Sequence, residues 1–247
     1  MIVIKTKEDI KRMRVSNKIT GNVRDQVAAS VRPGVTTGEL GEYARELIEK
    51  AGGKCGFLGY NGYPGTICVS VNEEIVHGIP GNRIIKLGDI VSIDVGVLLD
   101  GFYGDTATTV MVGVTDPAVI KLVRTTERAF AAGLEQAKVG NRLSDISHAV
   151  QVLSEKAGFS VVRDFVGHGI GRKLHEDPQI PNFGRAGKGP VLKAGMTLAI
   201  EPMLNMGKKD VRILADKWTV VTKDKKLSSH YEHTVLIKSD GVEILTK

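Results

Sequence analysis

The chain has 247 residues, of which 42% are hydrophobic and 25% charged, which are ordinary values for a globular protein with a substantial core. Its net charge of +6 is dispersed, and no segment approaches the roughly 18 apolar residues that a membrane span requires. The first residues lack the apolar stretch and cleavage site of a secretory signal, so we expect a cytoplasmic protein.

Two cysteines, Cys55 and Cys68, are too few for a disulfide framework or a structural zinc site. We expect both to be reduced and to serve as packing or pocket residues.

Helical periodicity opens the chain. One pattern covers residues 7–31. A second begins at a capping box formed by Thr36 and Glu39 and ends at Gly52. A third long helical pattern, residues 116–137, lies in the second half of the chain.

A hairpin with two acids follows the first pair of helices. Residues 100–101, Asp-Gly, are typical of a two-residue type I′ turn between two apolar strands. With that turn, Asp105 pairs with Gly96, and Asp94 becomes a diagonal neighbour of Asp105 on the same face. Two buried carboxylates so close would require a cation to remain ionised. The alternative is a pair of surface acids on an exposed edge.

An internal repeat relates the two halves of the chain. Residues 49–52 and 155–158 are identical, and residues 86–94 resemble residues 193–201. Glu201 is therefore the counterpart of Asp94 in the second half of the chain.

The repeat includes a histidine motif, because residues 77–79, His-Gly-Ile, recur as residues 168–170. We expect one domain, residues 1–247, with two similar α+β halves of about 7–112 and 113–247. The halves would meet about a pseudo-twofold axis where acids from both converge.

The candidate metal ligands are four carboxylates and one imidazole, namely Asp94, Asp105, His168, Glu201 and Glu232. Oxygen-rich sets with one nitrogen suit Mn²⁺, Fe²⁺, Co²⁺ or Zn²⁺. Carboxylates can bridge two such ions, which activate water and polarise a carbonyl.

These motifs together closely resemble those of the type I methionine aminopeptidases. The resemblance rests on VNEEIVHGIP, VSIDVG, GFYGDTATT, FVGHGIGRKLHEDPQIP, LAIEPM and YEHTVLI, and it covers essentially the whole chain. It implies the pita-bread (creatinase/aminopeptidase) fold, with antiparallel sheets flanked by helices. It also implies hydrolysis of the first peptide bond of nascent proteins, releasing methionine when the second residue is small.

The resemblance implies a centre with two divalent ions (Co, Mn, Fe or Zn). Asp94 would bind one ion, His168 and Glu201 the other, and Asp105 and Glu232 both. Glu201 would also act as general base and then as acid.

Two further histidines receive roles from the resemblance. His175 would hydrogen-bond the scissile peptide and stabilise charge on the tetrahedral intermediate. His77 would contact the substrate backbone or assist the leaving amine, with a purely structural role as the alternative.

The resemblance also places an apolar methionine pocket and a monovalent cation site. The pocket residues would be Phe57, Tyr60, Tyr63, Cys68, Leu174 and Trp218, with core packing as the alternative for the tyrosines. Phe57 and Leu174 depart from the commonest bacterial pattern of cysteine and phenylalanine, which exchanges bulk across the pocket. Na⁺ or K⁺ would bind near Asn72 and Ser228.

Two other functions are compatible with these motifs. An aminopeptidase or dipeptidase of the Xaa-Pro type shares the fold and ligands, but its relatives usually carry a large extra N-terminal domain. A metal-free binding module on the same fold would have lost ligands that are present here. We expect a monomer without membrane contact, and the basic charge leaves open a transient contact with the ribosome.

Overall fold

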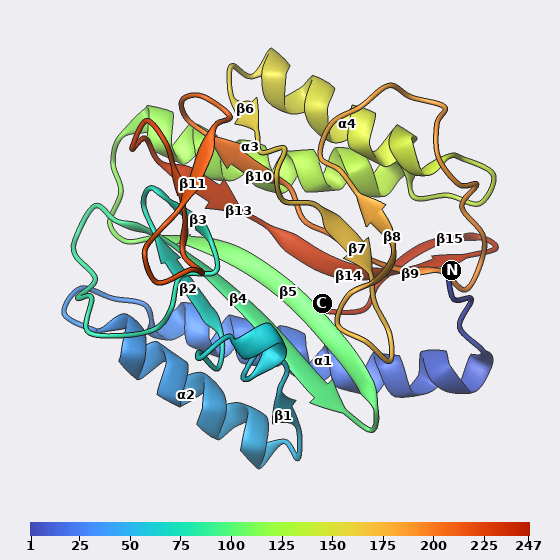
Figure 1. The fold of residues 1–247 in the computed structure, drawn as a ribbon, viewed down its shortest axis with the longest axis horizontal. Coiled ribbons are helices and arrows are strands. Elements are labelled where there is room, and N and C mark those ends of the chain that lie inside the picture. Colours follow the sequence, from blue (N-terminus) through green and yellow to red (C-terminus); the bar gives the residue numbers. More distant parts are fainter.

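Two pairs of helices pack against one long sheet in the computed structural model, which describes residues 1–247 (Figure 1). The first pair is α1 (Lys7–Ser30) and α2 (Thr37–Lys50), and the second pair is α3 (Pro117–Gln136) and α4 (Leu143–Lys156). The helices predicted at residues 7–31 and 116–137 are thus confirmed to within a residue at each end. None of the helices has the length and apolar character needed to cross a bilayer.

The central sheet has nine strands, all paired antiparallel, with the order β1-β4-β5-β14-β9-β7-β8. Off this path, β2 pairs with β4, and β15 pairs with β14. The strands are β1 (Lys54–Cys55), β2 (Cys68–Val71), β4 (Ile90–Leu99), β5 (Phe102–Met111), β7 (Gly167–Gly169), β8 (Glu176–Ile180), β9 (Thr197–Ile200), β14 (Glu232–Lys238) and β15 (Gly241–Ile244).

Two small sheets of three strands each complete the fold. One has the order β13-β10-β6 and the other β11-β12-β3. Their strands are β3 (Glu74–Val76), β6 (Ser160–Val161), β10 (Met203–Asn205), β11 (Val211–Ile213), β12 (Val220–Thr222) and β13 (Ser228–His230), and a single 3-10 turn, η1, spans Tyr60–Gly62.

The β4–β5 hairpin has the predicted register. Asp100 and Gly101 both have positive φ, 50° and 77°, as a type I′ turn requires. Gly96 pairs with Asp105, so Asp94 lies on the same face as Asp105 and diagonal to it. The space beside Gly96 is filled by the ring of Phe57, because an added Cβ would lie 2.7–2.9 Å from two of its ring carbons.

The two halves share local features at the starts of α2 and α4. The amide of Thr36 donates to the Glu39 carboxylate (2.7 Å), and the amide of Arg142 donates to that of Asp145 (2.7 Å). Each N-cap residue also forms an isolated antiparallel bridge. Thr36 pairs with Ile84, and Arg142 pairs with Val191. Corresponding residues therefore begin the corresponding helices in the same way.

The core lies between the helices and one face of the sheet. One cluster joins α1 and α2 to β2 and β4, and a second joins α3 and α4 to β9 and β14. Because side chains alternate along a strand, the β4 residues Ile93, Val95 and Val97 enter the first cluster while Asp94 points to the opposite face. The helices therefore leave that face of the hairpin free for the acids.

Gly104 tests how closely α1 packs on β5. A Cβ at this position would clash with the Thr20 hydroxyl and lie 3.0 Å from Asn17 Cα, which is backbone that cannot rotate away. We expect Gly104→Ala to lower the free energy of unfolding by about 1–3 kcal/mol in urea denaturation.

The control is Gly81→Ala, since the nearest atom to its added Cβ is 3.9 Å away. That variant should change the free energy of unfolding by no more than about 0.5 kcal/mol. Equal effects of the two substitutions would show that α1 does not constrain β5.

Candidate metal centre

A cavity of about 190 Å³ opens on the helix-free face of the hairpin. It brings together all five predicted ligands, both predicted nonligand histidines and all six predicted pocket residues, together with Asn61. Its lining is Phe57, Tyr60, Asn61, Tyr63, Cys68, His77, Asp94, Asp105, His168, Leu174, His175, Glu201, Trp218 and Glu232.

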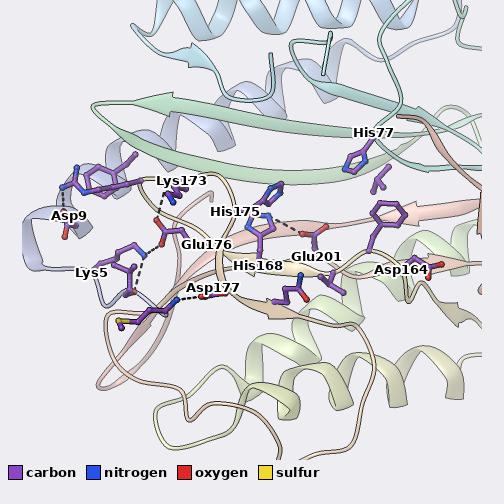
Figure 2. A pocket seen from close by; sticks show the side chains of 18 residues that line it. Lys5, Asp9, His77, Asp164, His168, Lys173, His175, Glu176, Asp177 and Glu201 are labelled. Atoms are coloured by element: carbon purple, nitrogen blue, oxygen red, sulfur yellow. Dashed lines mark hydrogen bonds and ion pairs between the residues drawn. The ribbon is translucent and has the colours of Figure 1, made fainter. Parts of the chain in front are cut away.

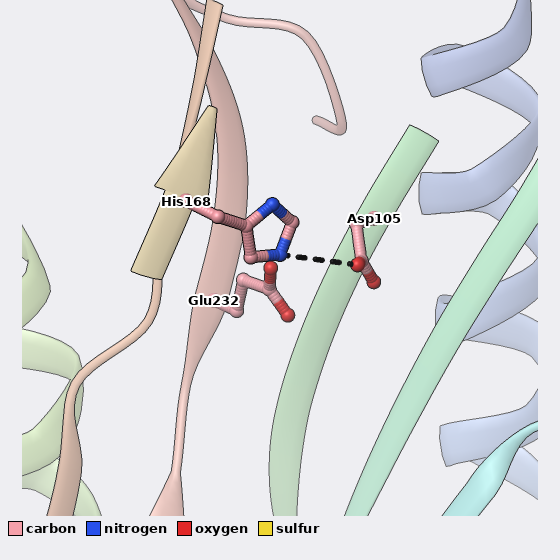
Figure 3. Close-up of side chains that lie close together, drawn as sticks. All are labelled: Asp105, His168 and Glu232. Carbon is pink, nitrogen blue, oxygen red and sulfur yellow. Dashed lines mark ion pairs between the residues drawn. The ribbon is translucent and has the colours of Figure 1, made fainter. Parts of the chain in front are cut away.

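The donor atoms of Asp105, His168 and Glu232 all lie within 4.8 Å of one another (Figure 3). His168 Nε2 is 3.7 Å from an Asp105 carboxylate oxygen and 3.6 Å from Glu201 Oε1. Asp105 lies on β5, His168 on β7 and Glu232 on β14. Glu201 directly follows β9, and Asp94 lies on β4. Five segments of the chain therefore bring these donors to one cavity.

Hydrogen bonding fixes the tautomer of His168. Its Nδ1 lies 2.9 Å from the carbonyl oxygen of Gly169, which can only accept, so Nδ1 carries the proton. Burial lowers the pKa of His168 to about 3, so the ring is neutral. Its Nε2 therefore presents a lone pair to two carboxyl groups, an arrangement that needs a proton or a metal ion between them to be favourable.

The carboxyl groups likewise need protons or cations to neutralise their charge. Burial raises the pKa of Asp94, to about 7, and raises those of Asp105, Glu201 and Glu232, whose mutual repulsion raises the last three further. Asp94 Oδ1, Asp105 Oδ1 and Glu232 Oε1 are buried without a hydrogen-bond partner. Unpartnered oxygens facing one another in a buried cavity fit divalent metal ions.

The backbone beside the acids is held by threonine hydroxyls. Thr234 Oγ1 accepts from the Asp105 amide (3.2 Å) and donates to the Asp105 carbonyl (2.8 Å). Thr106 Oγ1 donates to the Glu232 carbonyl (2.7 Å). These bonds fix the two central acids against the repulsion between their side chains.

His175 is oriented by Tyr60. The Tyr60 hydroxyl lies 2.8 Å from His175 Nδ1, and the two rings meet edge to face at 5.1 Å. Burial lowers the pKa of His175, so the ring is neutral. With the hydroxyl donating to Nδ1, Nε2 carries the proton and can donate to a ligand in the cavity.

His77 occupies a strained position immediately after β3. Its φ is 60°, which is rare for a residue with a Cβ, and its ring packs against Phe165 (5.5 Å) and Trp218 (6.3 Å). Burial lowers its pKa to about 4, with the nearby His175 adding to the shift.

The apolar end of the cavity is rigid. Tyr63 is buried, and its hydroxyl donates to the carbonyls of Ile67 (3.1 Å) and Gly78 (3.0 Å). Trp218 meets the Tyr63 ring edge to face at 5.1 Å. An apolar side chain entering here finds preformed walls.

A larger groove of about 750 Å³ leads to this cavity (Figure 2). The two share His77, His168, His175 and Glu201. Charged residues of both signs line the outer part of the groove, including the buried ion pair of Lys5 with Glu176 (2.7 Å).

The residues predicted to bind Na⁺ or K⁺ lie outside this cavity. The Ser228 amide donates to the Asn72 carbonyl (2.9 Å), so the two residues are adjacent. Asn72 has a positive φ of 62°. The monovalent cation site stays a prediction.

Sequence reasoning missed two residues of the site. Asn61 lines the cavity from the η1 turn, and His230 approaches Glu201 and Glu232 from β13. The signal for His230 was its spacing, because residues two apart in an extended chain share a face and His230 precedes Glu232 by two.

The fold and the donor set define a metal-dependent hydrolase. The sequence model of metallopeptidase family M24 matches residues 11–239, and the chain belongs to this family.

Individual relatives agree with this assignment. Methionine aminopeptidase of Clostridium perfringens (strain 13 / Type A) is 54% identical over 246 residues, which cover 100% of this chain and 99% of the relative. The crystal structure of methionine aminopeptidase from Thermotoga maritima has a TM-score of 0.98 and 47% identity, with 100% of each chain covered. Prolidase from Pyrococcus furiosus has a TM-score of 0.81 and 23% identity, covering 99% of this chain and 65% of its own. That last likeness concerns the fold alone, which is the predicted α+β pita-bread architecture.

The raised carboxyl pKa values make the stability of the metal-free protein depend on pH. Because the pKa of Asp94 rises from 3.8 to about 7 on folding, the folded state binds its proton more tightly than the unfolded chain does. Its contribution to the free energy of unfolding should therefore fall as the pH rises through this interval. We expect chelator-treated protein to be less stable in urea at pH 8 than at pH 5.

Asp94→Asn removes this titration and is the matched variant. The free energy of unfolding of Asp94→Asn, compared with that of the unsubstituted protein, should increase between pH 5 and pH 8. A difference that does not change with pH would contradict the raised pKa of Asp94.

Proposed function

We propose that the protein is a methionine aminopeptidase that removes the N-terminal methionine from polypeptides whose second residue is small. The observation that carries the proposal is one cavity in which a cluster of metal-binding side chains adjoins a rigid apolar pocket. The full-length identity of 54% to a methionine aminopeptidase supports it.

Five side chains would hold two divalent ions of cobalt, manganese, iron or zinc. Asp94 would bind one ion, His168 and Glu201 the other, and Asp105 and Glu232 both. Such ions activate water and polarise a carbonyl as Lewis acids when bound. The unpartnered carboxylate oxygens and the lone pair of His168 are the donors that this assignment requires.

Glu201 and His175 would handle protons and charge on the substrate. Glu201 lines both the cavity and the groove, so its carboxylate is placed to take a proton from water and return it to the leaving amine. The Nε2–H of His175 would donate a hydrogen bond to the scissile carbonyl oxygen as negative charge develops there. A hydrogen bond donated by the Tyr60 hydroxyl to Nδ1 would keep His175 in the tautomer that this role needs.

The sizes of the two spaces favour action at a chain end. The inner cavity of about 190 Å³ has room for one apolar side chain, with walls formed by Phe57, Leu174 and Trp218 among others. The groove of about 750 Å³ would take the rest of the polypeptide, and His77 lies where the two meet. His77 would contact the substrate backbone there.

The alternatives are less well supported. A Xaa-Pro peptidase would not need the apolar pocket, and the prolidase likeness concerns the fold only. A metal-free binding module would not need five converging donors in a buried cavity.

The setting follows from this activity. We infer a monomer that acts in the cytoplasm on nascent chains, with at most transient contact with the ribosome through its dispersed basic charge. Na⁺ or K⁺ near Asn72 and Ser228 would stabilise the loop beside β13.

A comparison of three peptides tests the proposal. With Mn²⁺ or Co²⁺ supplied, the protein should release methionine from Met-Ala-Ser and not from Met-Lys-Ser, and it should leave a Xaa-Pro peptide intact. Asp105→Ala should reduce the release at least about 100-fold, because losing a direct ligand costs more than losing an outer hydrogen-bond partner.

Glu135→Ala, which alters an exposed acid of α3, is the control and should keep full activity. Cleavage confined to the Xaa-Pro peptide would refute the proposal in favour of the prolidase-like activity. Absence of turnover with every metal would favour the binding module.

A further inference from the structure

His230 is a buried histidine that the proposed mechanism does not use. It ends β13, two residues before Glu232, and is only 2% exposed. The Thr109 hydroxyl accepts from the His230 amide (3.1 Å) and donates to its carbonyl (2.8 Å). These bonds fix the backbone, and burial limits the space available to the ring.

Both ring nitrogens of His230 lack a hydrogen-bond partner. The contrast with His233 on the neighbouring strand is direct, because its Nε2 contacts the Tyr231 hydroxyl (3.1 Å) and its Nδ1 the Thr246 hydroxyl (2.8 Å). A buried polar group left without a hydrogen-bond partner destabilises the folded state. His233 is thus a satisfied structural histidine, whereas the buried ring of His230 has no hydrogen-bond partner among the residues around it.

Two of the proposed metal ligands lie close to His230 Nε2. Glu201 Oε2 lies 3.7 Å away and Glu232 Oε2 4.0 Å away. The other oxygen of Glu201, Oε1, faces His168 Nε2 at 3.6 Å. The Glu201 carboxylate therefore lies between two imidazoles, one facing each of its oxygens.

The two imidazoles differ in their position relative to the cavity. His168 lines the cavity, and its Nδ1 proton is committed to a carbonyl, which leaves Nε2 as a metal donor. His230 does not line the cavity, although Glu201 and Glu232 do. The Nε2 of His230 thus lies within 4.0 Å of both carboxylates without lining the cavity where ions and substrate would bind, which suits a hydrogen-bond donor better than a ligand.

We propose that His230 is a positioning residue whose Nε2–H donates a hydrogen bond to Glu201 Oε2 in the metal-loaded enzyme. The separation of 3.7 Å would shorten to a hydrogen bond, as such contacts do when an active site is filled. The bond fixes the orientation of the carboxylate, so that Oε1 stays directed toward His168 and the metal site. The inference rests on the proposed function for the role of Glu201 as base.

Three variants separate a donor from a space-filling ring. In His230→Gln the amide nitrogen replaces Nε2, in His230→Asn it replaces Nδ1, and His230→Leu has no donor. Metal affinity is measured by calorimetry with Mn²⁺, ligand geometry by the visible absorption of Co²⁺-loaded protein, and kcat and KM with Met-Ala-Ser. Thermal unfolding of the loaded variants checks that each one folds.

The Leu and Asn variants should lose about 10–100-fold in kcat or Mn²⁺ affinity, with KM little changed. This is the usual effect of removing a residue that hydrogen-bonds a metal ligand. The Gln variant should recover to within a few-fold and keep the Co²⁺ spectrum. Equal behaviour of all three folded variants would overturn the donor role. Failure of Gln to rescue, with a Co²⁺ spectrum showing a lost nitrogen ligand, would also overturn it, because His230 would then bind the metal itself.

The affinity and spectroscopic measurements do not depend on the peptide. If the unsubstituted protein fails to release methionine, the proposed function fails, while the metal measurements still decide the role of His230.

Discussion

The repulsion among buried carboxylates is the constraint on which the rest of the structure depends. Asp94, Asp105, Glu201 and Glu232 meet in one cavity, where burial and mutual charge raise their pKa values. Such a cluster opposes folding unless protons or cations neutralise it. The threonine hydroxyls that hold the backbone of Asp105 and Glu232, and the carbonyl that fixes the tautomer of His168, keep the donors in place for cations. The same feature that destabilises the metal-free protein thus prepares the site.

The repeated architecture explains how distant segments reach this point. Both helix pairs build cores against the sheet, and Asp94 points away from the core beneath it. Asp94 near the middle of β4 and Glu201 just after β9 are corresponding residues of the two halves. β5 and β14 lie next to each other between them and supply Asp105 and Glu232. The donors therefore come from five consecutive strands of one continuous sheet, or from the residue directly after a strand in the case of Glu201.

How far the sequence predicts the structure depends on how local each feature is. The hairpin register and the helix starts follow from nearby residues, such as the Asp-Gly turn and the Thr36–Glu39 box, and both are confirmed. The convergence of the donors was only suggested by the repeat, and the pocket residues came from family resemblance. The two small sheets and the outer groove depend on long-range packing that no local pattern encodes. His230 was missed because its spacing of two residues from Glu232 is a weak signal until the fold places its ring 3.7 Å from Glu201.

The most direct test of the two-ion centre is a crystal structure of the protein loaded with Mn²⁺, with the ions located by anomalous scattering. Two ions should occupy the inner cavity, with Asp105 and Glu232 each contacting both ions and His168 Nε2 contacting one of them. Ions located elsewhere, or a loaded cavity in which Asp105 contacts no ion, would contradict the account.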